Sequence, residues 1–160
     1  MATTTAPGTW LKVLADSETI SPWVTPAWTF DDPGFLMSAT LHPSLADLPA
    51  GYQLRTWSRG DVTRALVRDM DGAFAAHGQV AGSSRADSVV FDQIETAPAH
   101  RRQGLGRAVM HALTDVAIEA GAQAGVLAAT IEGQRLYKSL GWTTHAPLTS
   151  IFLTSSDAGR

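Results

Sequence analysis

The sequence predicts an α/β fold, of the α+β kind with a mixed sheet, and two observations lead to this prediction. A long helical pattern runs from Gly104 to Ala120, between extended runs at Ser88–Thr96 and Ala124–Ala129. A helix between two strands serves as a crossover, so we expect these two strands to be parallel. Upstream, short extended runs separated by turn signals such as Asp71-Gly72 predict antiparallel hairpins.

Composition narrows the class of protein. A chain of 160 residues with 44% apolar and 17% charged residues predicts one compact domain. The net charge of -3 argues against a nucleic-acid partner, and no apolar run approaches membrane-spanning length. The chain has no cysteine and its five histidines show no metal-ligand spacing, so we expect no metal. The missing cysteines and the lack of a secretory signal fit a cytoplasmic protein.

The first fifty residues are the hardest to interpret. They hold three of the five tryptophans and six of the eight prolines. Trp10–Leu14 is expected to begin a short helix and Phe35–Leu41 to form a strand. We expect residues 1–50 to pack on a core formed by residues 51–160.

The middle of the chain reads mainly as strands. Tyr52–Trp57 and Ala73–Ala81 are expected strands, whereas Val62–Arg68 fits a short helix or a strand. A turn is expected at 82–87.

Helical periodicity is clearest after Gly104. One apolar face is predicted there, formed by Leu105, Ala108, Val109, Ala112, Leu113, Val116 and Ala120. Thr130 can cap a second helix over Ile131–Leu140, which Gly141 ends. Trp142–His145 and Thr149–Leu153 predict a closing pair of strands joined at 146–148.

The stretch Arg101–Arg107, with the sequence RRQGLGR, joins a strand to a helix and is suited to bind phosphate. Its glycines let the backbone approach a ligand, and the first N–H groups of a helix have no internal partner. No Gly-Lys pair occurs, which excludes a mononucleotide P-loop. Val109 stands where a dinucleotide-binding fingerprint needs its third glycine or alanine.

Two motifs together resemble the GNAT superfamily of N-acetyltransferases. Arg101–Gly106 matches the acetyl-CoA signature Q/R-x-x-G-x-G/A, and Pro98 precedes it as in that family. Leu136–Trp142, with the sequence LYKSLGW, matches the family element L-Y-x-x-L-G-F, with Trp for Phe. The resemblance implies a GNAT-like acyl-CoA N-acyltransferase fold in which the central parallel strands splay apart.

The resemblance also implies how acetyl-CoA, the co-substrate, is held. Backbone groups of Ile94 and Thr96 would contact its pantetheine arm, and Thr130 stands where many relatives place an Asn for that arm. Tyr137 matches the family tyrosine that protonates the departing thiolate. The diphosphate and 3′-phosphate would be met by the turn, through Arg101, Arg102, Gln103, Gly104, Leu105, Gly106 and Arg107.

The general base stays open at the level of sequence. Asp92 is the first candidate, and Glu95 the second because a regular strand would point it to the opposite face. His77 and His145 are secondary candidates.

The implied activity is transfer of an acetyl group from acetyl-CoA to a primary amine by direct attack, since no cysteine can form an acyl-enzyme. The alternative is a CoA-binding regulatory or sensor module without turnover. Small-molecule and peptide amines both stay open as acceptors. Relatives often pair through sheet edges or C-terminal strands, so the resemblance is compatible with a homodimer.

Overall fold

Strands dominate the structure, a computed structural model that describes residues 8–44, 47–82 and 87–154. The strands are β1 (Trp10–Val13), β2 (Trp28–Phe30), β3 (Gly34–Thr40), β4 (Tyr52–Arg59), β5 (Val62–Asp69), β6 (Phe74–Ala81), β7 (Ser88–Thr96), β8 (Ala124–Thr130) and β9 (Thr143–Leu153). The helices are α1 (Ser17–Ile20), α2 (Leu105–Glu119) and α3 (Ile131–Ser139), with short 3-10 turns at Ser21–Trp23 and Pro98–His100.

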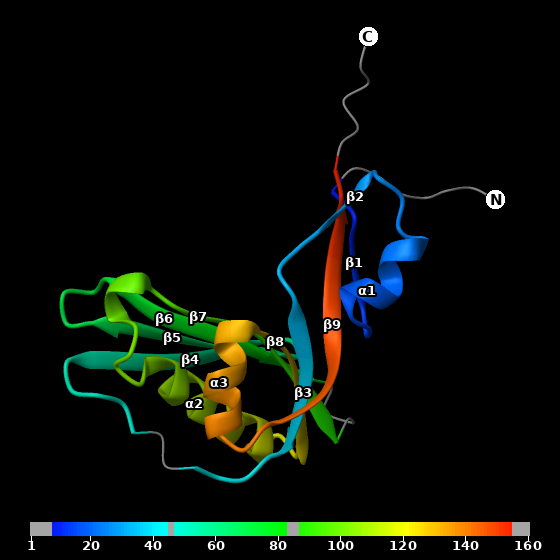
Figure 1. Cartoon of the computed structure of the whole chain (residues 1–160). Coiled ribbons are helices and arrows are strands. Elements are labelled where there is room, and N and C mark those ends of the chain that lie inside the picture. The colour runs from blue at the N-terminus through cyan, green and yellow to red at the C-terminus, as the bar shows by residue number, and fades with distance from the viewer. Residues whose placement is uncertain (1–7, 45–46, 83–86, 155–160) are drawn as a thin grey trace.

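The strands form one mixed sheet in the order β1-β9-β3-β8-β7-β6-β5-β4, and β2 also pairs with β9 (Figure 1). β7 and β8 are parallel, as predicted, and α2 connects them. The β4–β5 and β5–β6 hairpins are antiparallel, which resolves Val62–Arg68 as a strand. Most of the predicted turn at 82–87 lies outside the described residues.

β7 and β8 separate before either strand ends. Their pairing runs from Ser88 opposite Ala124 to Phe91 opposite Leu127, and each strand then continues without the other. The splayed central pair that the resemblance implied is therefore confirmed. The gap leaves backbone groups of both strands free to bond a ligand.

Helix α2 covers one face of β4–β7 (Figure 1). The predicted apolar face is largely right: Leu105, Ala108, Val109 and Leu113 are buried. Helix α3 packs mainly on β8 instead, and Thr130 caps its N-terminus: the Thr130 hydroxyl accepts from the Gly133 N–H at 3.0 Å. The predicted cap is confirmed.

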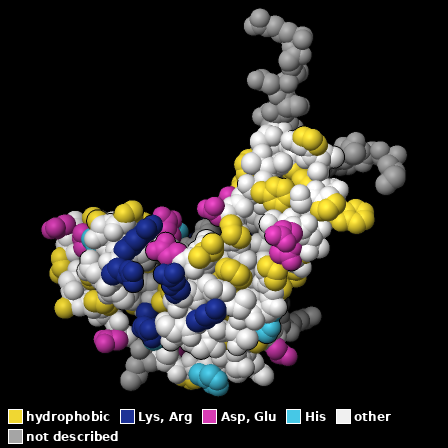
Figure 2. All heavy atoms as spheres, in the orientation of Figure 1, with side chains coloured by type: hydrophobic (Ala, Val, Ile, Leu, Met, Phe, Trp, Pro, Cys, Tyr) yellow, Lys and Arg dark blue, Asp and Glu magenta, His cyan; other side chains and the backbone are white. Residues whose placement is uncertain are grey.

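The first fifty residues contribute to the sheet itself. β3 lies between β8 and β9 and pairs with both. β1 and β2 flank the C-terminal half of β9, and with α1 they form an arm that projects from the body (Figure 1). Figure 2 shows hydrophobic side chains gathered on this arm. The division of the chain at residue 50 stays a prediction.

Two expected elements are wrong. Trp10–Leu14 begins no helix, because Trp10–Val13 pairs with β9 and Trp10 stacks on Phe152 at 4.9 Å. The helix starts later, at Ser17, where the Asp16 side chain accepts from the Thr19 N–H.

The closing strands are also continuous, forming the single strand β9 rather than a pair joined at 146–148. The strand changes partners instead of turning: it pairs with β3 up to Leu148 and with β1 from Thr149. The β3–β9 register shifts between Ala146 and Thr144, whereas Pro147 pairs regularly with Phe35.

Candidate active site

The gap between β7 and β8 opens into a cleft of about 810 Å³. Its walls come from the end of β7, the turn before α2, the first turn of α2, and α3. The lining residues are Ile94, Glu95, Thr96, Arg101, Arg102, Gly104, Leu105, Gly106, Arg107, Thr130, Glu132, Gly133, Arg135, Leu136 and Tyr137. Tertiary structure thus brings both sequence motifs to one cleft.

The turn before α2 presents unpaired backbone donors. Gly104 caps the helix with φ +82°, and no side chain completes the cap. The first helical bond runs from the Ala108 N–H to the Gly104 carbonyl at 3.0 Å. The N–H groups of Leu105, Gly106 and Arg107 therefore have no partner inside the helix, and these residues line the cleft. Such donors, at the positive end of the helix dipole, favour an anion.

Gly106 also keeps this turn close to the second helix. A Cβ there would lie 3.0 Å from Leu136 Cδ2 and 3.7 Å from Thr96 Oγ1. A side chain at this position would take up space between the start of α2 and α3, both of which line the cleft.

Three arginines of the turn reach the cleft with different partners. Arg101 Nε donates to the Thr96 carbonyl at 3.3 Å, and Arg107 Nη2 donates to Ser139 Oγ at 3.1 Å. Arg102 has φ +63° and makes no hydrogen bond or ion pair within the described part of the chain. Its guanidinium is available to an anionic ligand.

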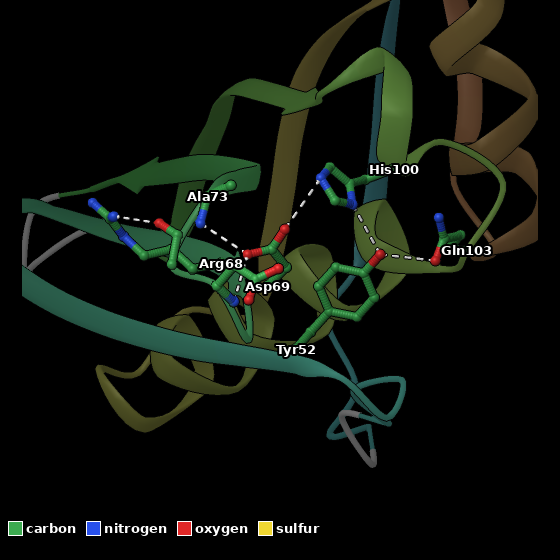
Figure 3. A network of polar contacts seen from close by, with 8 residues as sticks. Tyr52, Arg68, Asp69, Ala73, His100 and Gln103 are labelled. Atoms are coloured by element: carbon green, nitrogen blue, oxygen red, sulfur yellow. Dashed lines mark hydrogen bonds and ion pairs between the residues drawn. The ribbon is translucent and has the colours of Figure 1, made fainter.

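Gln103 is the member of the turn that does not line the cleft. Its Oε1 accepts from the Tyr52 hydroxyl at 2.8 Å, and the same hydroxyl lies 2.9 Å from His100 Nδ1 (Figure 3). His100 Nε2 is 3.8 Å from Asp69 Oδ2, at the β5–β6 hairpin. These contacts tie the turn to the hairpins, so the side chain of Gln103 positions the turn.

Tyr137 is 6% exposed and lines the cleft. Its ring lies 6.1 Å from that of Trp142 and packs on Gly133, where a Cβ would be 3.2 Å from Tyr137 Cε2. No hydrogen bond engages its hydroxyl among the residues that the structure describes. Burial, reinforced by the charge of Asp92, raises the pKa of Tyr137 to about 12. The phenol is therefore protonated and free to donate at neutral pH.

Asp92 and Glu95 share one face of the sheet, so the prediction that they point to opposite faces is wrong. Asp92 lies opposite Gln79, and Glu95 lies opposite His77. Gln79 and His77 stand two residues apart on β6, so their side chains point to the same face of the sheet. The register shifts between them, where Gln93 of β7 has φ +54°. This extra residue reverses the alternation of the strand. Glu95 lines the cleft, whereas Asp92 acts on Tyr137 through its charge.

Of the remaining candidates, three line the cleft and the two histidines do not. Ile94, Thr96 and Thr130 all line the cleft, although the Thr130 hydroxyl is already engaged by the α3 cap. His145 Nε2 lies 2.6 Å from Ser38 Oγ and does not line the cleft. His77 lies beside Glu95 on the neighbouring strand, with its ring 5.4 Å from that of Phe74.

Sequence reasoning missed Glu132, Gly133 and Arg135, which also line the cleft. All three lie within five residues of Tyr137 on α3. Helical spacing from Tyr137 was the available signal, since Gly133 precedes it by four residues.

The residues that the structure describes contain no group of three or more His, Asp or Glu side chains arranged to hold a metal ion. None of their helices has the length and hydropathy needed to cross a membrane.

Comparison with solved structures shows the fold. A GCN5-related N-acetyltransferase from Kribbella flavida is 19% identical with a TM-score of 0.62, over 82% of this chain and 62% of that one. Another from Sphaerobacter thermophilus is 13% identical with a TM-score of 0.67, over 91% and 59%. A GNAT-family structure from Novosphingobium aromaticivorans is 19% identical with a TM-score of 0.66, over 96% and 77%. This chain thus spans about three-fifths of the first two.

No curated protein matches this chain. The model of the acetyltransferase (GNAT) family matches residues 26–142, which is more than half of the chain. The match includes the turn before α2, the cleft and Tyr137. The chain therefore belongs to the GNAT acetyltransferase family, which carries out acyl transfer.

Proposed function

We propose that this protein is an acetyl-CoA-dependent N-acetyltransferase that acetylates a primary amine by direct attack. One observation carries the proposal: the Tyr137 hydroxyl and the N–H groups that begin α2 line the same cleft, and neither has a hydrogen-bond partner among the described residues. The first is a proton donor and the second an anion site, as transfer from a CoA thioester requires.

The cleft residues fit acetyl-CoA. The N–H groups of Leu105, Gly106 and Arg107 suit a diphosphate, and Arg102 offers a guanidinium that has no partner in the described part of the chain. Beyond Phe91 the edge of β7 has no partner in β8, so the backbone of Ile94 and Thr96 can bond the pantetheine amides. Acetyl-CoA supplies the activated acetyl group as a thioester.

Each candidate catalytic residue has one task in this mechanism. Asp92 and Glu95 accept, directly or through water, the proton that the amine loses as its nitrogen forms the new C–N bond. Tyr137 donates its proton to the sulfur as the C–S bond breaks. An amide and a free CoA thiol result, and solvent exchange returns the proton to Tyr137.

Binding and turnover can be tested separately. We expect millimolar acetyl-CoA to raise the Tm of the protein, and an Arg102→Glu variant to lose most of this shift. Arg59→Glu is the matched control, because Arg59 is exposed on β4 and does not line the cleft. No shift for the wild-type protein contradicts the proposal.

Release of CoA thiol in the presence of primary amines tests turnover. We expect acetyl-CoA and an accepted amine to give thiol and N-acetyl product in equal amounts. Binding of CoA without thiol release across a broad amine panel would instead favour the sensor module. The cytoplasmic location and the homodimer stay predictions.

A further inference from the structure

A second hollow, of about 320 Å³, lies on the sheet beside the cleft. Its lining residues come from β4–β7: Trp57, Arg64, Ala65, Leu66, Phe74, His77, Gly78, Gln79 and Gln93. Most of these side chains lie on the face of the sheet opposite to α2, since Arg64, His77 and Gln79 alternate with residues buried under that helix. At this size the hollow suits a small molecule.

Three polar side chains of the hollow have no hydrogen-bond or ion-pair partner among the residues that the structure describes. Arg64 is half-buried, yet no hydrogen bond or ion pair engages it in the described part of the chain. The amides of Gln79 and Gln93 are equally unengaged among those residues. Among the described residues no carboxylate lines the hollow, and Arg64 gives that lining a cationic character. The side chains of Trp57 and Phe74 add apolar walls, and both rings are partly exposed.

The hollow lies in register with the two carboxylates. Arg64 pairs with Gln79, and Gln79 pairs with Asp92, so the three stand in one row across β5–β7. Two strand spacings separate Arg64 from Asp92, about 10 Å between backbones. In the next row His77 pairs with Glu95, which lines the acetyl-CoA cleft. The hollow thus holds a cation, Arg64, and its Gln79 and His77 pair with the two carboxylates Asp92 and Glu95, which lie next to its lining on β7.

We propose that this hollow binds the acceptor, and that the acceptor is a small amino acid-like molecule. This inference rests on the proposed N-acetyltransferase activity. The acceptor carboxylate meets Arg64 and the amides of Gln79 and Gln93, while its amine lies at Asp92 and Glu95, facing the cleft. Its side chain packs between Trp57 and Phe74. Charge favours this class, because a simple amine leaves Arg64 unpaired and a basic peptide side chain brings no anion.

Matched pairs of acceptors test the proposal. Free amino acids, led by phenylalanine, are compared with the corresponding amines that lack the carboxylate, led by phenethylamine, and with short peptides. We expect the wild-type kcat/KM to favour the amino acid over its amine by roughly 10- to 100-fold, as charge-assisted hydrogen bonds do. In Arg64→Gln this ratio falls close to one, mainly through a higher KM for the amino acid.

Arg59→Gln is the matched control, because it removes the same charge from the same face of β4–β5 outside the hollow. We expect it to keep the wild-type ratio. A second readout is the indole N–H signal of Trp57 in NMR, assigned with Trp57→Phe. Phenylalanine should shift this signal in the presence of CoA, with roughly tenfold weaker affinity in Arg64→Gln.

The outcomes separate this inference from the proposed function. If acetyl-CoA raises the Tm and peptides or simple amines are acetylated better than every amino acid, the acceptor assignment is overturned and the enzyme remains. The assignment also fails if Arg64→Gln keeps the wild-type ratio. If acetyl-CoA does not bind, the proposed function itself fails.

Discussion

Replacing Tyr137 with phenylalanine tests the proposed proton donor directly. The variant keeps the buried ring and removes one hydroxyl, which makes no hydrogen bond in the described part of the protein. We therefore expect kcat to fall by roughly 10²- to 10⁴-fold, the usual contribution of general acid catalysis. The Kd for acetyl-CoA and the fold should change little, because the hydroxyl has no hydrogen bond to the described residues that could be lost.

The same hydroxyl should give the protein a specific pH dependence of stability. Burial and the charge of Asp92 raise the pKa of Tyr137 from 10.0 to about 12. The folded state thus prefers the neutral phenol, and the stabilisation is complete below pH 10 and lost as the pH rises towards 12. The rise corresponds to roughly 3 kcal/mol, and Tyr137→Phe should be spared this loss.

Two measurements check the reasoning. Absorbance at 295 nm reports tyrosine ionisation, and Tyr137 is one of only two tyrosines in the chain. The titration of Tyr52→Phe should then show a single transition near pH 12, and urea unfolding at pH 9 and above 10 should give the stability difference. A Tyr137 transition near pH 10, or less than a tenfold loss of kcat in Tyr137→Phe, would refute the assignment of a buried proton donor.

Three other changes have distinct expected results. Gly125→Ala should destabilise the protein by about 1–3 kcal/mol in urea unfolding, because its Cβ would lie 2.7 Å from Phe91 Cε2 and 2.8 Å from Trp142 Cη2; wild-type stability would contradict this packing. Tyr52→Phe should cost about 1 kcal/mol of stability and weaken acetyl-CoA binding in calorimetry, since it removes the hydrogen bonds from Tyr52 to His100 and Gln103. An unchanged Kd would show that these hydrogen bonds are not needed for acetyl-CoA binding. Asp92→Asn should lower the pKa of Tyr137, because it removes a negative charge that raises that pKa. It should also reduce kcat/KM by roughly 10²-fold. An unchanged titration at 295 nm would show that the charge of Asp92 does not act on Tyr137.

Local chemistry made much of the fold predictable. The helical period after Gly104, the Thr130 cap and the crossover between β7 and β8 each depend on a few neighbouring residues, and all three are confirmed. The errors fall where long-range pairing decides. Trp10–Val13 becomes a strand because it pairs with residues 149–152 of β9. The residues around Pro147 stay extended because they pair with β3, more than a hundred residues away in the sequence.

The candidate site also combines features that depend on neighbouring residues with features that depend on long-range strand pairing. The sequence by itself determined the glycine turn before α2, because glycine conformation and helix termini are local properties, and it placed Tyr137 on the helix that follows β8. Only the tertiary structure decided that Asp92 and Glu95 share a face, since that depends on a bulge against β6. It likewise placed Gln103 on Tyr52 and set Arg64 in line with Asp92 across three strands. Register across a sheet is fixed by the whole set of paired strands, and no single segment encodes it.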